Sequence, residues 1–438
     1  MKALLRKFIP KKWLWQYHKT WAVLANKRYG HPSKKLIVIG VTGTNGKSTT
    51  SNLIAKVLEE TGAKVAMRTT INLKIGEKEW INPVHITTPG RMELAKFLKE
   101  ALDAGCKYAV IESSSEGLMQ NRTWGIEYDV AVMTNLTPEH IEAHGSFENY
   151  KKDKGKLFAG LKQYPNKMIE GVKIPKASVV NLDDAHWQYY FNFDADQKFA
   201  YAIDFVSKLP LAHVLKAGDI QLDVASTSFR IKEQDFKTNL VGKFNIYNCL
   251  SACCVGLLFG LNLNQCAQAL RKIKGVPGRM ELIDEGQPFT VLVDYAHDPT
   301  SFEILFNTLK MFAKKRIIHV FGSAGGVRDH AKRPVLGKLS GEHADITIVT
   351  DEDSYEEPVE KILGEIAEGA IQAGKVLEQN LFKIADRREA IKKACQIAEA
   401  GDMVLITGKG HEQSIDSNGK KIDWDDRQVA REVLQEIL

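Results

Sequence analysis

The stretch that decides the fold of this 438-residue chain is LIVIGVTGTNGKSTTSNLIAKVL, residues 36–58. Its first residues form a continuous apolar run, which is typical of a strand buried on both faces of a parallel sheet. A glycine-rich loop follows, and the next apolar residues share one face of a predicted helix: Leu53, Ile54, Val57 and Leu58. A strand, a glycine loop and a helix in this order predict a phosphate-binding loop at a helix N-terminus.

The loop departs from the pattern G-x-x-x-x-G-K-[ST], because Val41 occupies the first glycine position. The parts that bind phosphate remain. Gly43 and Gly46 permit the required backbone angles, Lys47 supplies charge for the β and γ phosphates, and Ser48 offers a hydroxyl to Mg²⁺. We therefore interpret the loop as a nucleotide site of a different kind rather than as a simple glycine turn.

Further apolar runs predict strands on both sides of a hinge sequence, KIKGVPG, at residues 272–278. They lie at residues 108–113, 129–135, 178–184, 290–296, 316–322, 346–351 and 402–408, and helical patterns separate them. This alternation predicts an α/β fold: a central P-loop-type ATPase domain with a mostly parallel sheet, and a C-terminal Rossmann-like α/β domain. The expected boundaries are 1–35 for an N-terminal arm, 36–276 for the central domain and 277–438 for the C-terminal domain.

The net charge of +6 is concentrated in the arm. Residues 1–35 contain ten lysines and arginines and no acid, whereas the rest of the chain carries 50 basic and 54 acidic side chains. A charge confined to an arm argues against a broad nucleic-acid-binding surface.

Within the arm, Trp13, Tyr17, Trp21 and Leu24 follow helical spacing. We expect this helix to pack on the next domain with its lysines in water. The alternative is contact with a membrane surface of anionic lipid.

The chain contains no run of 18 apolar residues and no plausible signal peptide, so neither a spanning helix nor secretion is expected. Its six cysteines form no C-x-x-C pair. Buried free thiols in a reducing compartment are the expected state, and a cytoplasmic protein follows.

The motifs of the chain resemble those of the Mur ligase family, in order, from about residue 36 to residue 412. They read TGTNGKS, IESSSEGLMQNR, TNLTPEHIEAHGSFENYKKDKGKLF, GKFNIYN, GVPGRMELI, VDYAHDP, VFGSAGGVRDHAKRP and ITGKGHE. The last motifs are similar to the MurE branch, which adds the third amino acid to UDP-N-acetylmuramoyl-dipeptide. The resemblance implies an ATP-dependent ligase that joins an amino acid to a muramoyl-peptide-type carboxylate through an acyl phosphate, in peptidoglycan precursor synthesis, with ATP and two Mg²⁺ ions.

The resemblance also implies the site residues. For ATP they are Gly43, Thr44, Asn45, Gly46, Lys47, Ser48, Thr49, Asn245, Asn248, Arg279, Asp294 and His297. For metal they are Ser48, Glu112, His140 and Lys154, the last as a carbamate. The catalytic set is Lys47, His140, Lys154, Arg279 and Lys332. The substrate set is Thr87, Thr88, Ser114, Arg122, Asp353, Gly408 and Glu412.

Lys154 is the most specific of these predictions. Ser146 is a good N-cap for a helix on which Lys154 shares a face with Tyr150, Leu157 and Phe158. Burial would lower the pKa of the lysine and favour the neutral amine, which can take up CO₂. On the residues alone, a solvated lysine is the simpler interpretation.

The chain departs from the family pattern in several places. Only about 35 residues precede the first predicted strand, so no N-terminal UDP-binding domain of the usual kind is expected. Glu116 stands where histidine is usual, and Glu139 where aspartate is usual. The segment TDEDSYEEP, residues 350–358, lacks the arginine of the D-N-P-R motif. Glu412 favours an incoming amino acid with an amine-bearing side chain.

Two other functions remain open on the sequence. One is a Mur-like ligase with a non-UDP or lipid-linked acyl substrate, and the other is a non-catalytic nucleotide-binding partner subunit. The complete set Lys47, Ser48, Glu112, His140 and Lys154 favours a ligase. We expect a monomer that binds small molecules.

Overall fold

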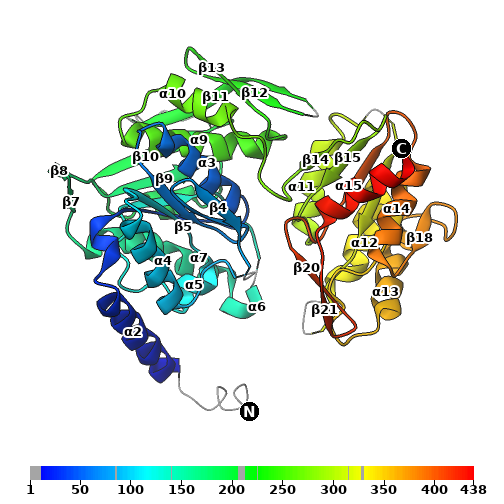
Figure 1. Cartoon of the computed structure of the whole chain (residues 1–438), viewed down its shortest axis with the longest axis horizontal. Coiled ribbons are helices and arrows are strands. Elements are labelled where there is room, and N and C mark those ends of the chain that lie inside the picture. The colour runs from blue at the N-terminus through cyan, green and yellow to red at the C-terminus, as the bar shows by residue number, and fades with distance from the viewer. Residues whose placement is uncertain are drawn as a thin grey trace. The chain divides into compact units, whose positions relative to one another are not determined.

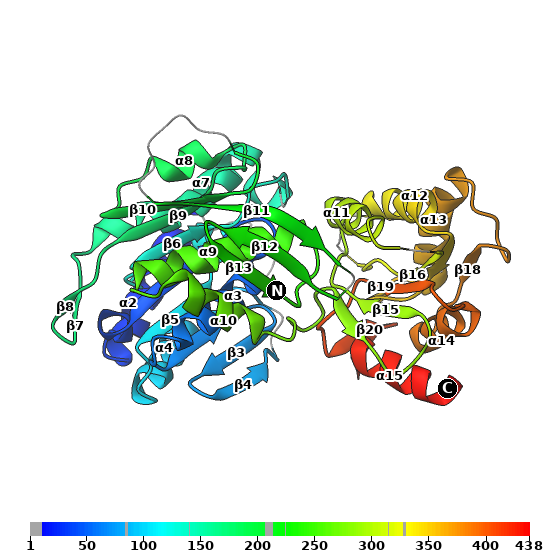
Figure 2. The same cartoon turned by 90° about the horizontal axis from the view of Figure 1, so that it is seen from above.

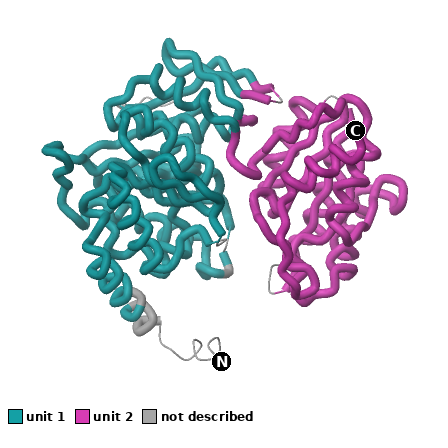
Figure 3. Tube along the Cα trace, viewed as in Figure 1, with its two compact units in different colours: residues 1–221, 227–239, 243–274 teal, residues 222–226, 240–242, 275–438 magenta. Residues whose placement is uncertain are grey.

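The computed structural model describes residues 11–83, 86–139, 141–205, 213–223, 225–313, 315–326 and 330–438. The chain divides into two compact units (Figure 3). Unit 1 comprises Met1–Gln221, Thr227–Asn239 and Lys243–Lys274, and unit 2 comprises Leu222–Ser226, Leu240–Gly242 and Gly275–Leu438.

In the described residues, unit 1 contains an eleven-stranded sheet in the order β13-β12-β11-β10-β9-β6-β1-β5-β2-β3-β4 (Figure 1). Its strands are β1 (Ile37–Thr42), β2 (Val65–Arg68), β3 (Asn72–Ile75), β4 (Lys78–Ile81), β5 (Tyr108–Glu112), β6 (Val130–Met133), β9 (Ala177–Asn181), β10 (Gln197–Ala202), β11 (Val214–Leu222), β12 (Thr227–Ile231) and β13 (Gln234–Thr238). The central pairs from β2 to β11 are parallel, and the β2–β3, β3–β4 and β12–β13 pairs are antiparallel. The predicted mostly parallel sheet is confirmed.

The central strands bring distant residues to one edge of the sheet. β1 is buried along its whole length, as its apolar run predicted. Its register pairs Val41 with Glu112 of β5 and with Val132 of β6. The loop that follows β1 therefore lies beside the acid that ends β5, at the carboxyl edge where open α/β sheets bind ligands.

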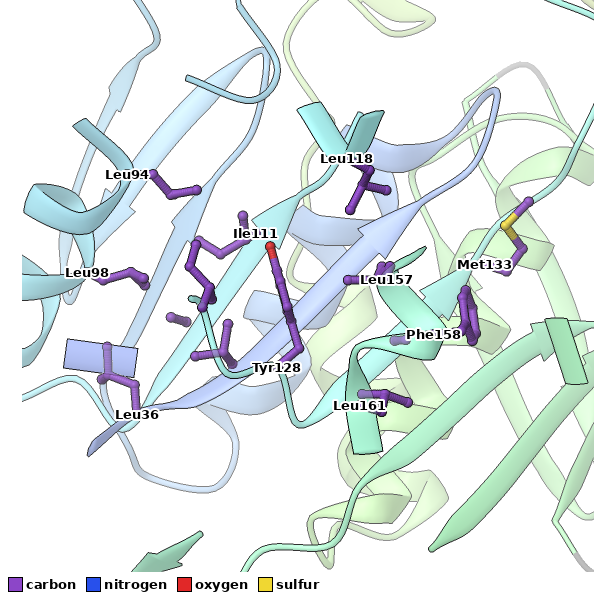
Figure 4. Packing of buried hydrophobic residues seen from close by; sticks show 14 of the residues in the cluster. Leu36, Leu94, Leu98, Ile111, Leu118, Tyr128, Met133, Leu157, Phe158 and Leu161 are labelled. Carbon is purple, nitrogen blue, oxygen red and sulfur yellow. The ribbon is translucent and has the colours of Figure 1, made fainter. Parts of the chain in front are cut away.

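Helices cover both faces of this sheet (Figure 1). On one face α3 (Lys47–Glu59), α9 (Lys243–Leu258) and α10 (Leu263–Arg271) pack together. Gly256 permits their close approach, because a Cβ there would lie 2.7 Å from Val57 and 2.8 Å from Cys266. The other face carries α4 (Arg91–Asp103), α5 (Ser115–Met119), α7 (Phe147–Ala159) and α8 (Trp187–Phe191). Their apolar side chains, including Leu98, Leu118 and Leu157, form the core drawn in Figure 4.

The first described helix, α2 (Lys11–Arg28), packs on the rest of unit 1 through a face that does not contain its aromatic stripe. Ala22, Ala25 and Asn26 are buried, whereas Tyr17, Trp21 and Leu24 are exposed. The small alanines allow close approach, and Asn26 donates a hydrogen bond to the carbonyl of Trp124. The expected packing of this helix on the next domain is thus observed, but Tyr17 and Trp21 do not take part in it, and the side chain of Trp13 lies outside the described residues.

The smaller elements of unit 1 are η1 (Pro32–Lys35), α6 (Ile141–His144), η2 (Leu161–Gln163) and a hairpin of β7 (Met168–Ile169) and β8 (Val172–Lys173). All six cysteines are unpaired and buried, as predicted. No helix among the described residues is long and apolar enough to span a bilayer.

Unit 2 contains a sheet in the order β14-β15-β19-β16-β17-β18 (Figure 2). Its strands are β14 (Glu281–Ile283), β15 (Thr290–Val293), β16 (Ile317–Phe321), β17 (Ile346–Val349), β18 (Leu381–Lys383) and β19 (Met403–Ile406). Only the β14–β15 pair is antiparallel among these described strands. The helices are α11 (Pro299–Leu309), α12 (Lys332–His343), α13 (Val359–Gln372), α14 (Arg387–Ile397) and α15 (Asp426–Ile437), and β20 (Ser414–Ser417) pairs with β21 (Lys420–Asp423).

Candidate active site

The phosphate loop between β1 and α3 depends on two glycines. Gly43 has φ of 152°, and a Cβ there would lie 1.8 Å from the hydroxyl of Thr134. Gly46 has φ of 79°, and a Cβ there would lie 2.6 Å from Oδ1 of Asn248. Any other residue at either position would collide with a polar side chain that holds the loop.

The N-terminus of α3 faces this loop without a side-chain cap from the described residues. Gly46 is its N-cap residue and Lys47 begins the helix. The first N–H groups of a helix have no partner within the helix, and together they attract an anion. The ammonium of Lys47 donates to the carbonyl of Thr44 at 2.5 Å, within the same loop. This geometry fits a nucleotide phosphate.

Glu112 joins the loop to a neighbouring strand end. Its carboxylate accepts from the hydroxyl of Ser48 at 2.7 Å, from the amide of Thr70 at 2.8 Å and from the hydroxyl of Thr70 at 3.1 Å. The hydroxyl of Thr87 lies 2.9 Å from that of Thr70 and can donate to it, because the single proton of Thr70 points to Glu112. A buried carboxylate beside a hydroxyl is the oxygen donor set that Mg²⁺ prefers, so Ser48 and Glu112 fit the predicted ion.

The other predicted acyl-substrate residues of unit 1 lie next to this pair. The hydroxyl of Thr88 accepts from the amide of Ser114 at 2.9 Å. Arg122 donates from Nη1 to the carbonyl of Thr88 at 2.7 Å, and from Nε and Nη2 to the amide oxygen of Gln120. The structure thus brings Thr87, Thr88, Ser114 and Arg122 to the carboxyl ends of β2 and β5.

Lys154 lies inside the same edge of the sheet. Ser146 caps α7 as predicted, and Tyr150, Lys154, Leu157 and Phe158 share one buried face, so the solvated lysine favoured by the residues alone is wrong. The ammonium of Lys154 donates to the carbonyl of Gly43 at 2.6 Å and lies 4.4 Å from the ring of Tyr150. Burial, together with the Lys47 ammonium, lowers the pKa of Lys154 well below its usual value. A lysine in this state fits the chemistry of carbamate formation.

His144, the last residue of α6, forms a buried hydrogen-bond network with side chains of α5 and α7. Its Nδ1 lies 2.7 Å from Asp153, and its Nε2 lies 3.1 Å from the hydroxyl of Ser115. The network ties α5 to α7 and makes His144 a positioning residue. His140, the other predicted histidine, lies outside the described residues. Within the described ranges, no three His, Cys, Asp or Glu side chains gather as a metal site, and the set of Ser48, Glu112, His140 and the Lys154 carbamate stays a prediction.

Asn248 of α9 lies against Gly46 of the phosphate loop, and Asn245 is its partner; both are buried. Asn248 donates to Oδ1 of Asn245 at 2.9 Å and accepts from Thr50 at 3.0 Å. The loop positions Thr44 and Asn45 are held in turn by Asn135. Thr49, the remaining predicted nucleotide residue, is buried in the first turn of α3.

Unit 2 gathers the predicted residues of the C-terminal motifs. The guanidinium of Arg279 lies 4.7 Å from the ring of Tyr295. Asp294 accepts from the amides of Met280 and Ala296, both at 2.7 Å, which fixes the start of this unit against β15. Desolvation raises the pKa of Asp294, and the nearby Arg279 opposes this rise.

A buried acid that the sequence did not single out lies among the cations of unit 2. Glu352 is 6% exposed, and its Oε2 has no hydrogen-bond partner among the described residues. Burial raises the pKa of Glu352, and the charges of Lys332 and His297 oppose this. Lys332 donates to the carbonyl of His297 at 2.8 Å. Gly408, with φ of 109°, leaves room for this acid, because a Cβ there would lie 2.5 Å from Oε2.

Asp353 and Glu412 share one cation. The ammonium of Lys409 lies 2.8 Å from Asp353 and 2.5 Å from Glu412. Tyr295 also donates to Glu412 at 3.4 Å. These three charged side chains therefore carry one negative charge in excess, before Glu352 is counted.

Three neighbours of the site were missed by sequence reasoning: Thr70, Gln120 and Glu352. Thr70 follows β2, so the rule that ligands bind at carboxyl ends of parallel strands could have indicated it. Gln120 stands two residues before Arg122, a spacing without a recognisable pattern. The position of Glu352 depends on the packing of Gly408, which no local pattern predicts.

Comparison with known proteins agrees with this geometry. Residues 41–256 match the Mur ligase middle domain, and residues 278–410 match the Mur ligase, glutamate ligase domain. A UDP-N-acetylmuramyl-tripeptide synthetase of Roseiflexus sp. (strain RS-1) is 40% identical over 425 residues, which cover 95% of this chain and 82% of that protein. This chain belongs to the Mur ligase family.

Other Mur ligases support the same assignment. A UDP-N-acetylmuramoyl-L-alanyl-D-glutamate--2,6-diaminopimelate ligase of Geobacillus thermodenitrificans is 39% identical over 419 residues, or 95% of this chain and 82% of that protein. A solved structure of a ligase with that same name has a TM-score of 0.62 at 30% identity, and it covers 92% of this chain and 79% of its own. The resemblance and the fold predicted from the motifs are thus confirmed for this Mur ligase.

Proposed function

We propose that this protein is an ATP-dependent ligase of the MurE type, which joins an amino acid to the carboxylate of a muramoyl peptide in peptidoglycan precursor synthesis. The observation that carries the proposal is the position of Glu112. It binds Ser48 of the phosphate loop and, through Thr70, reaches Thr87 on the acyl-substrate side. A nucleotide phosphate and an acyl carboxylate would therefore meet within one hydrogen-bonded cluster.

Two chemical steps are proposed for this cluster. The acyl carboxylate attacks the γ-phosphorus of ATP, which releases ADP and gives an acyl phosphate. The amine of the incoming amino acid then attacks the acyl carbon and expels phosphate, while the amine loses its proton. Lys47 and the N-terminus of α3 stabilise phosphate charge, and Arg122 and Thr88 hold the acyl substrate. Bound Mg²⁺, held by Ser48 and Glu112 and at a second position by His140 and the Lys154 carbamate, would supply charge neutralisation.

The remaining predicted roles belong to unit 2. Arg279, His297 and Lys332 bind the nucleotide or its γ-phosphate, and Asp294 binds the ribose, as the resemblance implies. Asp353, Gly408 and Glu412 receive the side chain of the incoming amino acid. The excess negative charge around Lys409 supports an amine-bearing side chain.

We further propose a cytoplasmic monomer that acts on small molecules and not on nucleic acid, with an N-terminal segment that contacts a membrane surface. The unpaired buried thiols support a reducing compartment. The exposed basic residues of α2 would also suit a lipid-linked acyl substrate, which is the second candidate.

The test is phosphate release from ATP and Mg²⁺ with UDP-N-acetylmuramoyl-dipeptide, against lysine, ornithine and meso-diaminopimelate. Release that requires both the UDP substrate and one amino acid supports the proposal and identifies that amino acid. Lys47→Ala should abolish this release, and retained ligation would overturn the role of the loop. Protein that binds ATP but releases no phosphate would favour the lipid-linked substrate.

A further inference from the structure

Helix α2 presents two unlike faces. Its packed face is narrow and consists of small or polar side chains, among them Ala22, Ala25 and Asn26. The exposed face carries Tyr17, Trp21 and Leu24 at 57%, 44% and 48% exposure. These residues are four and then three positions apart, so they form one stripe along the helix. The rings of Tyr17 and Trp21 lie against each other, with centroids 6.2 Å apart.

The charge around this stripe is predominantly positive. Lys27 and Arg28 are exposed in the last turn of α2, and Lys34 and Lys35 are exposed just after it. The first acid in the sequence is Glu59, so the arm has no acid of its own, and among these cations Lys34 lies 3.8 Å from Glu127 of the following domain. Aromatic rings, an aliphatic side chain and long basic side chains on one exposed helix match the needs of a membrane interface, where rings lie at headgroup level and ammonium groups contact phosphate.

We propose that α2 binds the headgroup region of an anionic lipid bilayer, with Tyr17, Trp21 and Leu24 inserted at the interface. A second copy of the chain would bring two clusters of like charge together, which disfavours self-association. A nucleic acid would attract the cations but would leave Leu24 and the exposed Val23 against phosphate. The lipid surface alone satisfies both the apolar stripe and the charge.

This binding adds a location to the proposed ligase and does not rest on its chemistry, because none of the α2 residues belongs to the phosphate or acyl-substrate cluster. A single short stripe gives weak, reversible binding, and the electrostatic part must weaken as salt is added. The helix thus places the enzyme at a membrane surface without anchoring it permanently.

The experiment is flotation of the full chain with phosphatidylcholine vesicles, with and without phosphatidylglycerol. The wild type should float only with the anionic vesicles, and added salt should release it. The variant Tyr17→Ser/Trp21→Ser/Leu24→Ser should lose about tenfold or more in partition coefficient. A matched control is Met168→Ser/Val172→Ser in the β7–β8 hairpin, which removes exposed apolar side chains elsewhere and should float like the wild type.

Two results would overturn the inference: absence of wild-type binding to anionic vesicles, or unchanged binding by the triple variant. Tighter binding to duplex DNA than to these vesicles would also overturn it. Phosphate release by the triple variant with soluble substrates should equal that of the wild type, which shows that it is folded. Failure of the wild type to release phosphate would count against the ligase proposal only and would leave the flotation result standing.

Discussion

Gly46→Ala tests the phosphate loop most sharply, because the chain contains a control glycine with the same backbone angle. Gly46 has φ of +79° and Gly62 has φ of +78°. A Cβ at Gly46 would lie 2.6 Å from Oδ1 of Asn248, whereas a Cβ at Gly62 meets nothing within 4 Å. The two substitutions therefore share the cost of a left-handed alanine and differ only in the collision at the loop.

The difference in unfolding free energy follows from the bonds of Asn248. The left-handed alanine costs about 1 kcal/mol at either position. At Gly46 the amide of Asn248 must also move, which weakens its bonds from Thr50 at 3.0 Å and to Asn245 at 2.9 Å. Each bond contributes about 1 kcal/mol net. We expect a loss of about 3 kcal/mol for Gly46→Ala and about 1 kcal/mol for Gly62→Ala, by the sum of these terms.

Urea unfolding and calorimetric titration with ATP measure the two consequences. ATP affinity should fall at least about tenfold for Gly46→Ala, because the N-terminus of α3 shifts with the loop, and should stay unchanged for Gly62→Ala. Adding Asn248→Ala to Gly46→Ala removes the collision, so the double variant should lose less stability than the sum of the single variants. Equal losses for the two alanine variants, or an unchanged ATP dissociation constant, would refute the reasoning.

Three other predictions rest on buried charges. Burial lowers the pKa of Lys167 to about 8, although the nearby Asp129 opposes this shift. Between pH 8 and 10.5 the unfolded chain therefore binds more protons than the folded chain, and the unfolding free energy of the wild type should rise by about 3 kcal/mol over that range. Urea unfolding of Lys167→Met should show no such rise. His144→Ala removes the bonds to Asp153 and Ser115 and should cost about 2 kcal/mol of unfolding free energy, with a raised KM for the acyl substrate; an unaltered KM would contradict its positioning role. Because burial raises the pKa of Glu352, wild-type stability should fall as pH rises above 4.5, the ordinary pKa of a glutamate. This fall should be absent in Glu352→Gln, whose KM for an amine-bearing amino acid should rise up to about tenfold.

Sequence reasoning succeeded where a local pattern fixes a long-range result. The apolar run of residues 36–42 predicted a strand buried on both faces, and β1 is buried throughout. The spacing of Tyr150, Lys154, Leu157 and Phe158 predicted one shared helix face, and all four are buried; the residues alone favoured a solvated lysine, and only the family resemblance favoured a buried one. The same rule predicted one stripe for Tyr17, Trp21 and Leu24 but could not show that this stripe is exposed while the helix packs through another face. Periodicity identifies a face, and only packing against Ala22 and Ala25 decides which face is covered.

The least predictable feature is that carbonyls of the phosphate loop bind two lysines, Lys47 at the start of α3 and Lys154 of α7. Lys47 donates to the carbonyl of Thr44 at 2.5 Å, and Lys154 donates to the adjacent carbonyl of Gly43 at 2.6 Å. Two ammonium groups thus lie on successive carbonyls of one loop, and the charge of Lys47 adds to burial in lowering the pKa of Lys154. We expect an incoming phosphate to compete with the carbonyl of Thr44 for the ammonium of Lys47. A motif names both lysines, but it cannot show that they share one loop as their partner, since residues 43 and 154 approach only when α7 packs against β1.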